Sequence, residues 1–317
     1  MRIAPGARVA RTAPSLALIA VLTVAAGCGA IKRSAIRSVA DTLSEGGETF
    51  TSHNDPELVE GAMHFALLLN ESLLESIPKH RPLLTSTCGA YTQFAYGFVQ
   101  ADAEAAQFDD YERSKALTAR ALNLALRARD FCWRGLEVAF PGITGALARD
   151  PVAAVARSKR EHVPLLYWSA ASLGTAISLG GLDRPELLID WPIVRALAER
   201  ALALDETWSR AAVHELMITV ESQGEALGGS EARARQHFAR AVELQNGLSP
   251  GPHVSLALGV VKAKQDREEF EKLMKIALAI DPDKDPGNRL VTLLTQRRAR
   301  LFLDHIDDLF LKLQGDR

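Results

Sequence analysis

The dipeptide His214-Glu215 begins like the motif of a zinc-dependent peptidase. In the full motif H-E-x-x-H, two histidines one helical turn apart bind the metal and the glutamate acts as the general base. Here Ile218 stands where the second histidine is required. Because isoleucine offers no atom to a metal, the motif is broken, and a hydrogen-bonded structural histidine is the commoner role for His214.

Other catalytic patterns are also incomplete. The eight histidines are scattered, and none forms a metal-binding pair on one helix turn. The glycine-rich stretches at Gly142–Gly145 and Gly224–Ser230 lack the Lys-Ser/Thr of a phosphate-binding loop, and no G-x-S-x-G is present. The neighbouring acids Asp109 and Asp110 would point to different helix faces. We therefore predict that the protein is not an enzyme and needs neither a metal nor a cofactor.

The context of Cys28 indicates covalent modification. A positively charged start precedes a short apolar stretch, Ser15 to Ala26, as in an export signal. Small residues then lead directly to Cys28, as in the bacterial lipobox, whose cysteine is acylated and becomes the mature N-terminus. We predict lipidation at Cys28, with a plain signal peptide and an incidental cysteine as the alternative. Since Gly29 follows instead of an aspartate, the outer membrane is weakly favoured over the inner, on the periplasmic side.

Two further cysteines, Cys88 and Cys132, lie in apolar helical stretches. An oxidising envelope compartment permits a disulfide between them. A buried free thiol is nevertheless the commoner state of cysteine in such surroundings, and we expect free thiols.

Aromatic residues provide the candidates for ligand binding. Tyr91, Phe94 and Phe98 share one helical stripe, with Tyr96 to one side of it. Such a stripe is usually part of a core, but tyrosine and tryptophan also line pockets, because they combine a large apolar area with one polar atom. Together with Tyr167, Trp168 and Gly174, the stripe forms the predicted lining of a ligand cavity or pore.

The elements that would position these residues are helices. Apolar residues recur at helical spacing almost everywhere after Pro56, and no alternating strand pattern or hairpin turn appears. The sequence predicts a signal peptide at residues 1–27, a tether with a short helix at 28–55, and a single α-helical domain at 56–317. Prolines and glycines mark the helix boundaries within this domain.

Three helix endings share a pattern whose alanines, Ala201, Ala241 and Ala277, are separated by 40 and 36 residues. These separations are close to the tetratricopeptide period of about 34 residues. Small residues are needed where two helices of a hairpin approach closely. The tryptophan-containing signature of the first repeat helix is absent. We predict a tetratricopeptide-like α-solenoid of helical hairpins, with an additional buried helix and a C-terminal helix.

Two segments depart from a simple repeat. Residues 134–163 are predicted to be an insertion with one short helix. The segment 164–180 is apolar on nearly every face, so we expect this helix to be buried on all sides. Its small residues Ala171, Gly174 and Ser178 fall at helical spacing. Tight helix packing is the commoner reason for such spacing, and the wall of a ligand channel is the alternative.

The charge balance argues against nucleic-acid binding. The 317 residues carry a net charge of -2, and a cleaved signal peptide would remove three arginines and no acid, leaving about -5. A general nucleic-acid binder needs a basic face. The hydrophobic content of 47% is sufficient for a sizeable core.

Several segments between residues 55 and 312 resemble the TRAP-transporter T-component (TatT-like) lipoprotein family. The most specific are Leu166-Tyr167-Trp168, the Ala-Val-His-Glu run that ends at Glu215, and Gln265-Asp266-Arg267 with Phe270. The resemblance implies a tetratricopeptide-like fold, a homotrimer, and association with the extracytoplasmic solute-binding component of a tripartite ATP-independent periplasmic (TRAP) transporter. It also implies an internal, largely apolar pore for a hydrophobic small molecule. The alternative function is an adaptor lipoprotein in envelope or outer-membrane assembly that binds no small molecule.

Overall fold

The computed structural model describes residues 33–44 and 46–311, and every regular element in these ranges is helical, which confirms the all-α prediction. A helix over residues 33–44 comes first. Then follow α2 (Glu48–Thr51), α3 (Pro56–Ser76), α4 (Arg81–Phe94), α5 (Gln100–Ala106), α6 (Tyr111–Ala139), α7 (Ile143–Arg149), α8 (Pro151–Val155) and α9 (Val163–Gly180). The remaining α-helices are α10 (Trp191–Leu204), α11 (Trp208–Glu221), α12 (Glu231–Leu244), α13 (Gly251–Leu256), α14 (Arg267–Ala279), α15 (Arg289–Asp304) and α16 (Ile306–Leu309).

Short helical turns connect several of these elements. Two are π-helical, η1 (Ala95–Val99) and η5 (Ala257–Val261). The others are 3₁₀ turns, η2 (Arg160–His162), η3 (Pro185–Asp190), η4 (Glu225–Leu227), η6 (Pro282–Lys284) and η7 (Pro286–Asn288). The predicted signal segment and Cys28 lie outside the described residues.

The helix starts follow local chemistry. The side chain of Asp55 accepts a hydrogen bond from the backbone N–H of Leu58 at 3.0 Å, and Pro56 occupies the first helical position of α3. An Asp or Ser side chain caps an unsatisfied backbone donor in this way. A proline at the first helical position costs no hydrogen bond, because a backbone N–H there would have no partner within the helix. Asp110, Ser230 and Asp266 cap α6, α12 and α14 in the same manner.

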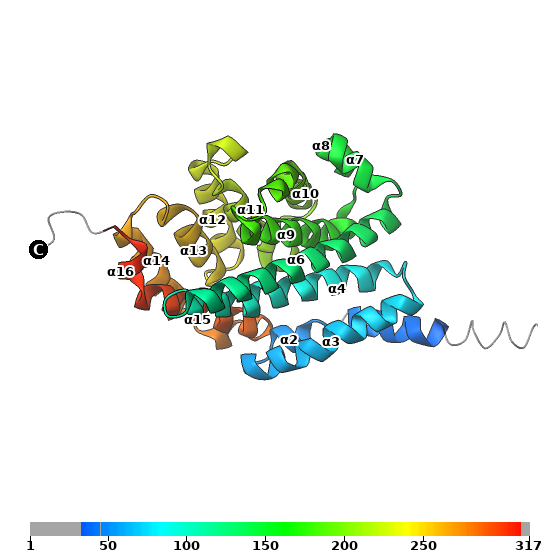
Figure 1. The fold of residues 1–317 in the computed structure, drawn as a ribbon, viewed down its shortest axis with the longest axis horizontal. Helices are drawn as coiled ribbons and strands as arrows, with labels where there is room; N and C mark the ends of the chain where they lie inside the picture. Colours follow the sequence, from blue (N-terminus) through cyan, green and yellow to red (C-terminus); the bar gives the residue numbers. More distant parts are fainter. Residues whose placement is uncertain (1–32, 45, 312–317) are drawn as a thin grey trace, which may run out of the picture.

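Three helices form the packed centre of the molecule. The long helix α6 packs against both α4 and α9, and these two also contact each other (Figure 1). On α6, Ala121, Ala125 and Ala128 are fully buried. Their small side chains allow the neighbouring helices to approach closely. A second hydrophobic cluster, which includes Phe270 and Phe302, lies among the C-terminal helices α12 to α15.

The alanines that suggested a repeat are buried in helix contacts. Ala201, Ala241 and Ala277 are all fully inaccessible, in α10, α12 and α14. Helix α12 packs against α11, and α14 packs against α15, so hairpins of neighbouring helices are present. The arrangement of these hairpins as a tetratricopeptide-like solenoid stays a prediction.

An ion-pair cluster around the buried Glu221 joins three consecutive helices. Glu221 at the end of α11 is 2.7 Å from Arg195 Nη1 of α10 and 2.9 Å from Arg233 Nε of α12. Burial by itself raises the pKa of the Glu221 carboxyl, but the two guanidinium groups outweigh burial and lower it. The ionised carboxylate therefore fixes α10, α11 and α12 relative to one another.

The segment 134–163 contains more structure than expected. Helix α6 continues to Ala139, and two short helices, α7 and α8, follow it. The prediction of one short helix is therefore wrong. Gly142 adopts a left-handed conformation with φ 82° and separates α6 from α7. Asp150 then starts a new helix by accepting a hydrogen bond from Ala153 N–H at 3.0 Å. The helical structure of this segment is therefore interrupted twice.

Candidate functional site

A large cavity lies among α3, α4, α9 and α11, with a volume of about 1120 Å³. Ligand pockets commonly measure roughly 300–1,000 Å³, so this cavity has the size needed for a lipid-like molecule. Its wall extends to the exposed side chains of Gln93 and Gln223, where the cavity reaches the protein surface.

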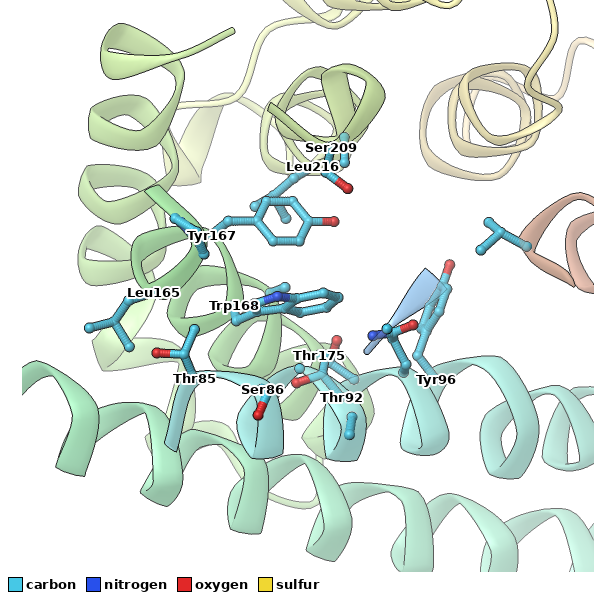
Figure 2. A pocket seen from close by; sticks show the side chains of 18 of the residues that line it. Thr85, Ser86, Thr92, Tyr96, Leu165, Tyr167, Trp168, Thr175, Ser209 and Leu216 are labelled. Atoms are coloured by element: carbon cyan, nitrogen blue, oxygen red, sulfur yellow. The ribbon is translucent and has the colours of Figure 1, made fainter. Parts of the chain in front are cut away.

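Aromatic side chains form much of the wall. Helix α9 contributes Tyr167 and Trp168, whose ring centroids lie 4.9 Å apart with the rings nearly perpendicular. Trp208, at the start of α11, lies 4.8 Å from the ring of Tyr167. Figure 2 shows Tyr167, Trp168 and Tyr96 facing the same space from α9 and η1. These rings offer a broad apolar surface to a ligand, with polar atoms only at their tips.

Helix α9 has one face in the core and one face on the cavity. Tyr167, Ala171, Gly174 and Ser178 recur at helical spacing, and all four line the cavity. A Cβ added at Gly174 would lie 3.5 Å from Val194 Cγ1, which is ordinary contact. The expectation that this helix is buried on every side is therefore wrong. The small residues Ala171, Gly174 and Ser178 on one face leave open volume beside α9.

The apolarity of α9 also raises the question of membrane insertion. By length and composition, the stretch Arg160–Gly180 could cross a bilayer, but 56% of its most apolar 18 residues is buried inside the fold. That burial is typical of the core helix of a folded domain, and here the buried face of α9 packs on α6 and α10.

The predicted aromatic stripe lies elsewhere. Tyr91, Phe94 and Phe98 are all buried and belong to the hydrophobic core, and none of the three lines the cavity. Tyr91 stacks on Phe131 of α6 with centroids 5.7 Å apart, and its hydroxyl donates a hydrogen bond to Glu71 of α3. The stripe therefore faces α3 and α6, because the apolar face of α4 is the one that packs against neighbouring helices.

The cavity face of α4 is marked by smaller and more polar residues. Thr85, Ser86, Gly89 and Gln93 line the cavity, and the same face continues to Tyr96 in η1. A Cβ at Gly89 would lie only 2.8 Å from Trp168 Cε2, so a glycine is required where the indole packs against α4. The spacing from Gly89 to Gln93 and Tyr96 is the sequence signal that would have identified this face.

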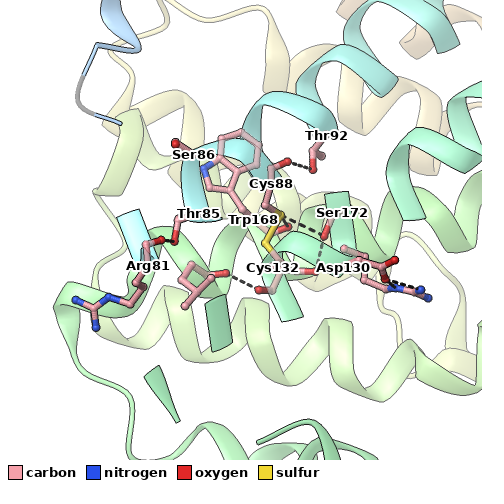
Figure 3. The surroundings of a disulfide bond; sticks show 12 residues. Arg81, Thr85, Ser86, Cys88, Thr92, Asp130, Cys132, Trp168 and Ser172 are labelled. Carbon is pink, nitrogen blue, oxygen red and sulfur yellow. Dashed lines mark hydrogen bonds and ion pairs between the residues drawn. A yellow bond between two sulfur atoms is a disulfide. The ribbon is translucent and has the colours of Figure 1, made fainter. Parts of the chain in front are cut away.

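A disulfide holds α4 and α6 together behind this wall. Cys88 and Cys132 are bonded, with their Cα atoms 5.4 Å apart, and both side chains are fully buried (Figure 3). The expectation of free thiols is therefore wrong. The two residues are 44 positions apart in sequence, and only the close packing of α4 on α6 brings them to bonding distance. Cys88 directly precedes Gly89, so the disulfide secures the part of α4 against which Trp168 of α9 packs.

Two polar side chains of the wall, Gln245 and Glu215, are hydrogen-bonded to each other. Gln245 Nε2 donates hydrogen bonds to Glu215 Oε1 at 2.6 Å and to the carbonyl oxygen of Arg210 at 2.9 Å. Burial raises the pKa of the Glu215 carboxyl, and hydrogen bonds from Gln245 and Ser249 only partly oppose this. Burial, together with the charge of Glu215, also raises the pKa of Tyr167. Sequence reasoning considered Glu215 only as part of the peptidase-like pattern and missed Gln245.

The backbone of the cavity wall contains a left-handed turn. Ser209, Arg210 and Ala211 have φ values of 48°, 55° and 58°. Each such residue with a side chain costs about 1–2 kcal/mol, so surrounding contacts must hold the turn. Arg210 Nε lies 2.8 Å from Asp285 Oδ2, and Gln245 donates to the carbonyl of Arg210. These contacts set the position of Ser209 and Arg210 in the lining.

No cluster of three or more potential metal ligands occurs in the described ranges. His214 instead pairs with His237, with 3.0 Å between their Nδ1 atoms, and its Nε2 is 3.1 Å from Glu206 Oε2. His214 is therefore hydrogen-bonded on both ring nitrogens within the protein, which is the structural role that the sequence suggested.

Comparison with known proteins covers nearly the whole helical body. A protein from Treponema pallidum (strain Nichols), itself uncharacterized, is 28% identical over 307 residues, which span 90% of this chain and 94% of that protein. The family model described as TRAP transporter T-component matches residues 52–310. That range contains the cavity-lining face of α9, the disulfide and the Glu215–Gln245 pair. The chain therefore belongs to the TRAP transporter T-component family and is associated with a transporter of this type.

Proposed function

We propose that the protein is an envelope lipoprotein that docks the extracytoplasmic solute-binding component of a TRAP transporter and holds a hydrophobic small molecule in its cavity. Membership of the T-component family supports the association with the transporter. The observation that carries the ligand proposal is the cavity of about 1120 Å³, with Tyr96, Tyr167, Trp168 and Trp208 in its wall. Aromatic side chains in a cavity wall bind apolar molecules by removing their surface from water.

The proposed place of the protein is the periplasmic side of the envelope, with a lipid anchor at Cys28. The support comes from the sequence, in which an export signal ends in small residues directly before that cysteine. The disulfide Cys88–Cys132 agrees with an oxidising compartment. Several acyl chains on one residue would hold the protein on a bilayer, since each buried CH₂ contributes about 0.8 kcal/mol. The proposed homotrimer and the outer-membrane location depend on the family resemblance and on Gly29 respectively.

Occupancy of the cavity separates the proposed function from its alternative. An adaptor in envelope or outer-membrane assembly would use its helices only for protein contacts and would not need an apolar cavity. A ligand carrier must hold a molecule there, and a tightly bound apolar molecule survives purification. The two functions therefore differ in what the purified protein contains.

The test is a native mass spectrum of protein purified without added ligand, compared with an Ala171→Phe variant. Ala171 lines the cavity on α9, so a phenyl ring there would occupy the ligand space. We expect a lipid-like adduct on the unmodified protein and at least a tenfold lower adduct fraction on Ala171→Phe. Thr175→Val, a substitution of equal size on the same wall, should keep the adduct. A spectrum without any adduct would favour the adaptor.

A further inference from the structure

One atom of the cavity wall lacks the hydrogen bond that its burial requires. Gln245 is only 8% exposed and lines the cavity. Its Oε1 has no hydrogen-bond partner among the residues that the structure describes. Buried polar atoms in proteins are almost always paired with protein, ligand or ordered water. Gln245 Oε1 is almost fully enclosed in this structure, so a small movement of neighbouring side chains would let a bound molecule supply the missing donor.

The orientation of the Gln245 amide is fixed by its other contacts. Nε2 donates both of its hydrogens, one to Glu215 Oε1 at 2.6 Å and one to the carbonyl oxygen of Arg210 at 2.9 Å. Rotating the amide by half a turn would place Oε1 against these two oxygens, which are acceptors in the present arrangement. The unpaired atom is therefore an acceptor, and its partner must carry an N–H or O–H group.

The carboxyl of Glu215 stands directly beside this acceptor. It accepts from Gln245 and Ser249, and Gly251 makes room for it, because a Cβ there would lie 2.1 Å from Glu215 Oε2. Burial raises the pKa of this carboxyl. Two polar side chains thus lie side by side in this part of the cavity wall.

We propose that Gln245 and Glu215 form a polar subsite that binds the uncharged hydroxyl group of an otherwise apolar ligand. The hydroxyl donates to Gln245 Oε1, whose orientation is fixed by the hydrogen bonds of Nε2 to Glu215 and Arg210, while the hydrocarbon part lies against Tyr167 and Trp168. The inference rests on the proposed binding of a hydrophobic molecule and specifies its class, a neutral amphiphile such as a long-chain alcohol. An anionic head group would meet oxygen acceptors at this point. The nearby Arg210 is already paired with Asp285.

The test compares lauryl alcohol with lauryl methyl ether, which has the same chain but no O–H donor. Binding is followed by the fluorescence of the cavity tryptophans Trp168, Trp191 and Trp208. We expect the wild-type protein to bind the alcohol about tenfold more tightly than the ether, as for one hydrogen bond to a buried acceptor. In Gln245→Met this preference should fall to about one. The control Gln93→Met, a glutamine of the same cavity on α4, should retain it.

The possible outcomes distinguish a failure of the polar subsite from a failure of the proposed ligand binding in the cavity. Equal binding of alcohol and ether by the wild-type protein would show that water satisfies Gln245, and would overturn the subsite while leaving the apolar cavity intact. If neither compound bound, the proposed ligand-binding function itself would fail. Tightest binding of lauryl amine would identify an ionised Glu215 and a cation site, which also contradicts the proposal. The wild-type comparison needs no variant, and circular dichroism checks the folding of both glutamine variants.

Discussion

At the scale of single residues, a chain of hydrogen bonds fixes the protonation of the histidine pair His214–His237. The pKa of Glu206 is lowered to about 2, chiefly by hydrogen bonds from Arg240 and His214, so its carboxylate only accepts. His214 therefore donates its Nε2–H to Glu206, and its Nδ1 accepts the Nδ1–H of His237. A proton added to His214 Nδ1 would place two N–H donors 3.0 Å apart, nitrogen to nitrogen.

This arrangement predicts lower stability in mild acid. Burial lowers the pKa of His214 and also that of His237 below the ordinary histidine value of 6.5. Below about pH 6.5 the unfolded chain gains protons that the folded protein resists, so the free energy of unfolding falls as the pH falls. We expect Tm to drop by about 2–4 °C per pH unit between pH 6.5 and pH 5.

The variant His237→Gln supplies the matched comparison. Its amide can turn to accept from a protonated His214, so the decline of Tm with falling pH should be shallower than in the wild type. His64→Gln removes an exposed histidine of α3 and should leave the slope unchanged. Equal slopes for all three proteins would show that the pair does not control acid stability.

At the scale of elements, the disulfide Cys88–Cys132 predicts a measurable contribution to stability. It links α4 and α6 across 44 positions, and closing a loop of that length contributes about 4 kcal/mol in the chain-entropy model. Reduction, or the double variant with serine at both positions, should lower Tm by about 10 °C. Scanning calorimetry with and without reductant checks this. Two titratable thiols in the unreduced, denatured protein would contradict the bond.

The sequence predicted the helices better than their faces. The sequence placed helix boundaries at prolines, and α3 does begin at Pro56, but the capping role of Asp55 was not predicted. The face of α4 that lines the cavity was not predicted, because Tyr91 and Tyr96 are both compatible with a pocket until the packing partners of α4 are known. Glu215 and Gln245 are 30 positions apart and meet only because α11 packs against α12, which no local pattern encodes.

At the scale of the whole molecule, the helices form a cavity beside their packed core. The wall combines segments from residues 43 to 291, so the cavity exists only when the complete helical body is folded. The ion-pair cluster at Glu221 and the disulfide hold the helices around it. In the proposed function, an apolar molecule bound in this cavity would stay away from water until it reaches a partner protein.

The most direct test of this account is crosslinking of the full-length protein in native membranes, followed by purification and mass spectrometry of the crosslinked partners. The account predicts recovery of the solute-binding component of a TRAP transporter, and loss of membrane association without loss of folding in Cys28→Ser. Recovery of envelope-assembly proteins alone, without that solute-binding component, would contradict it.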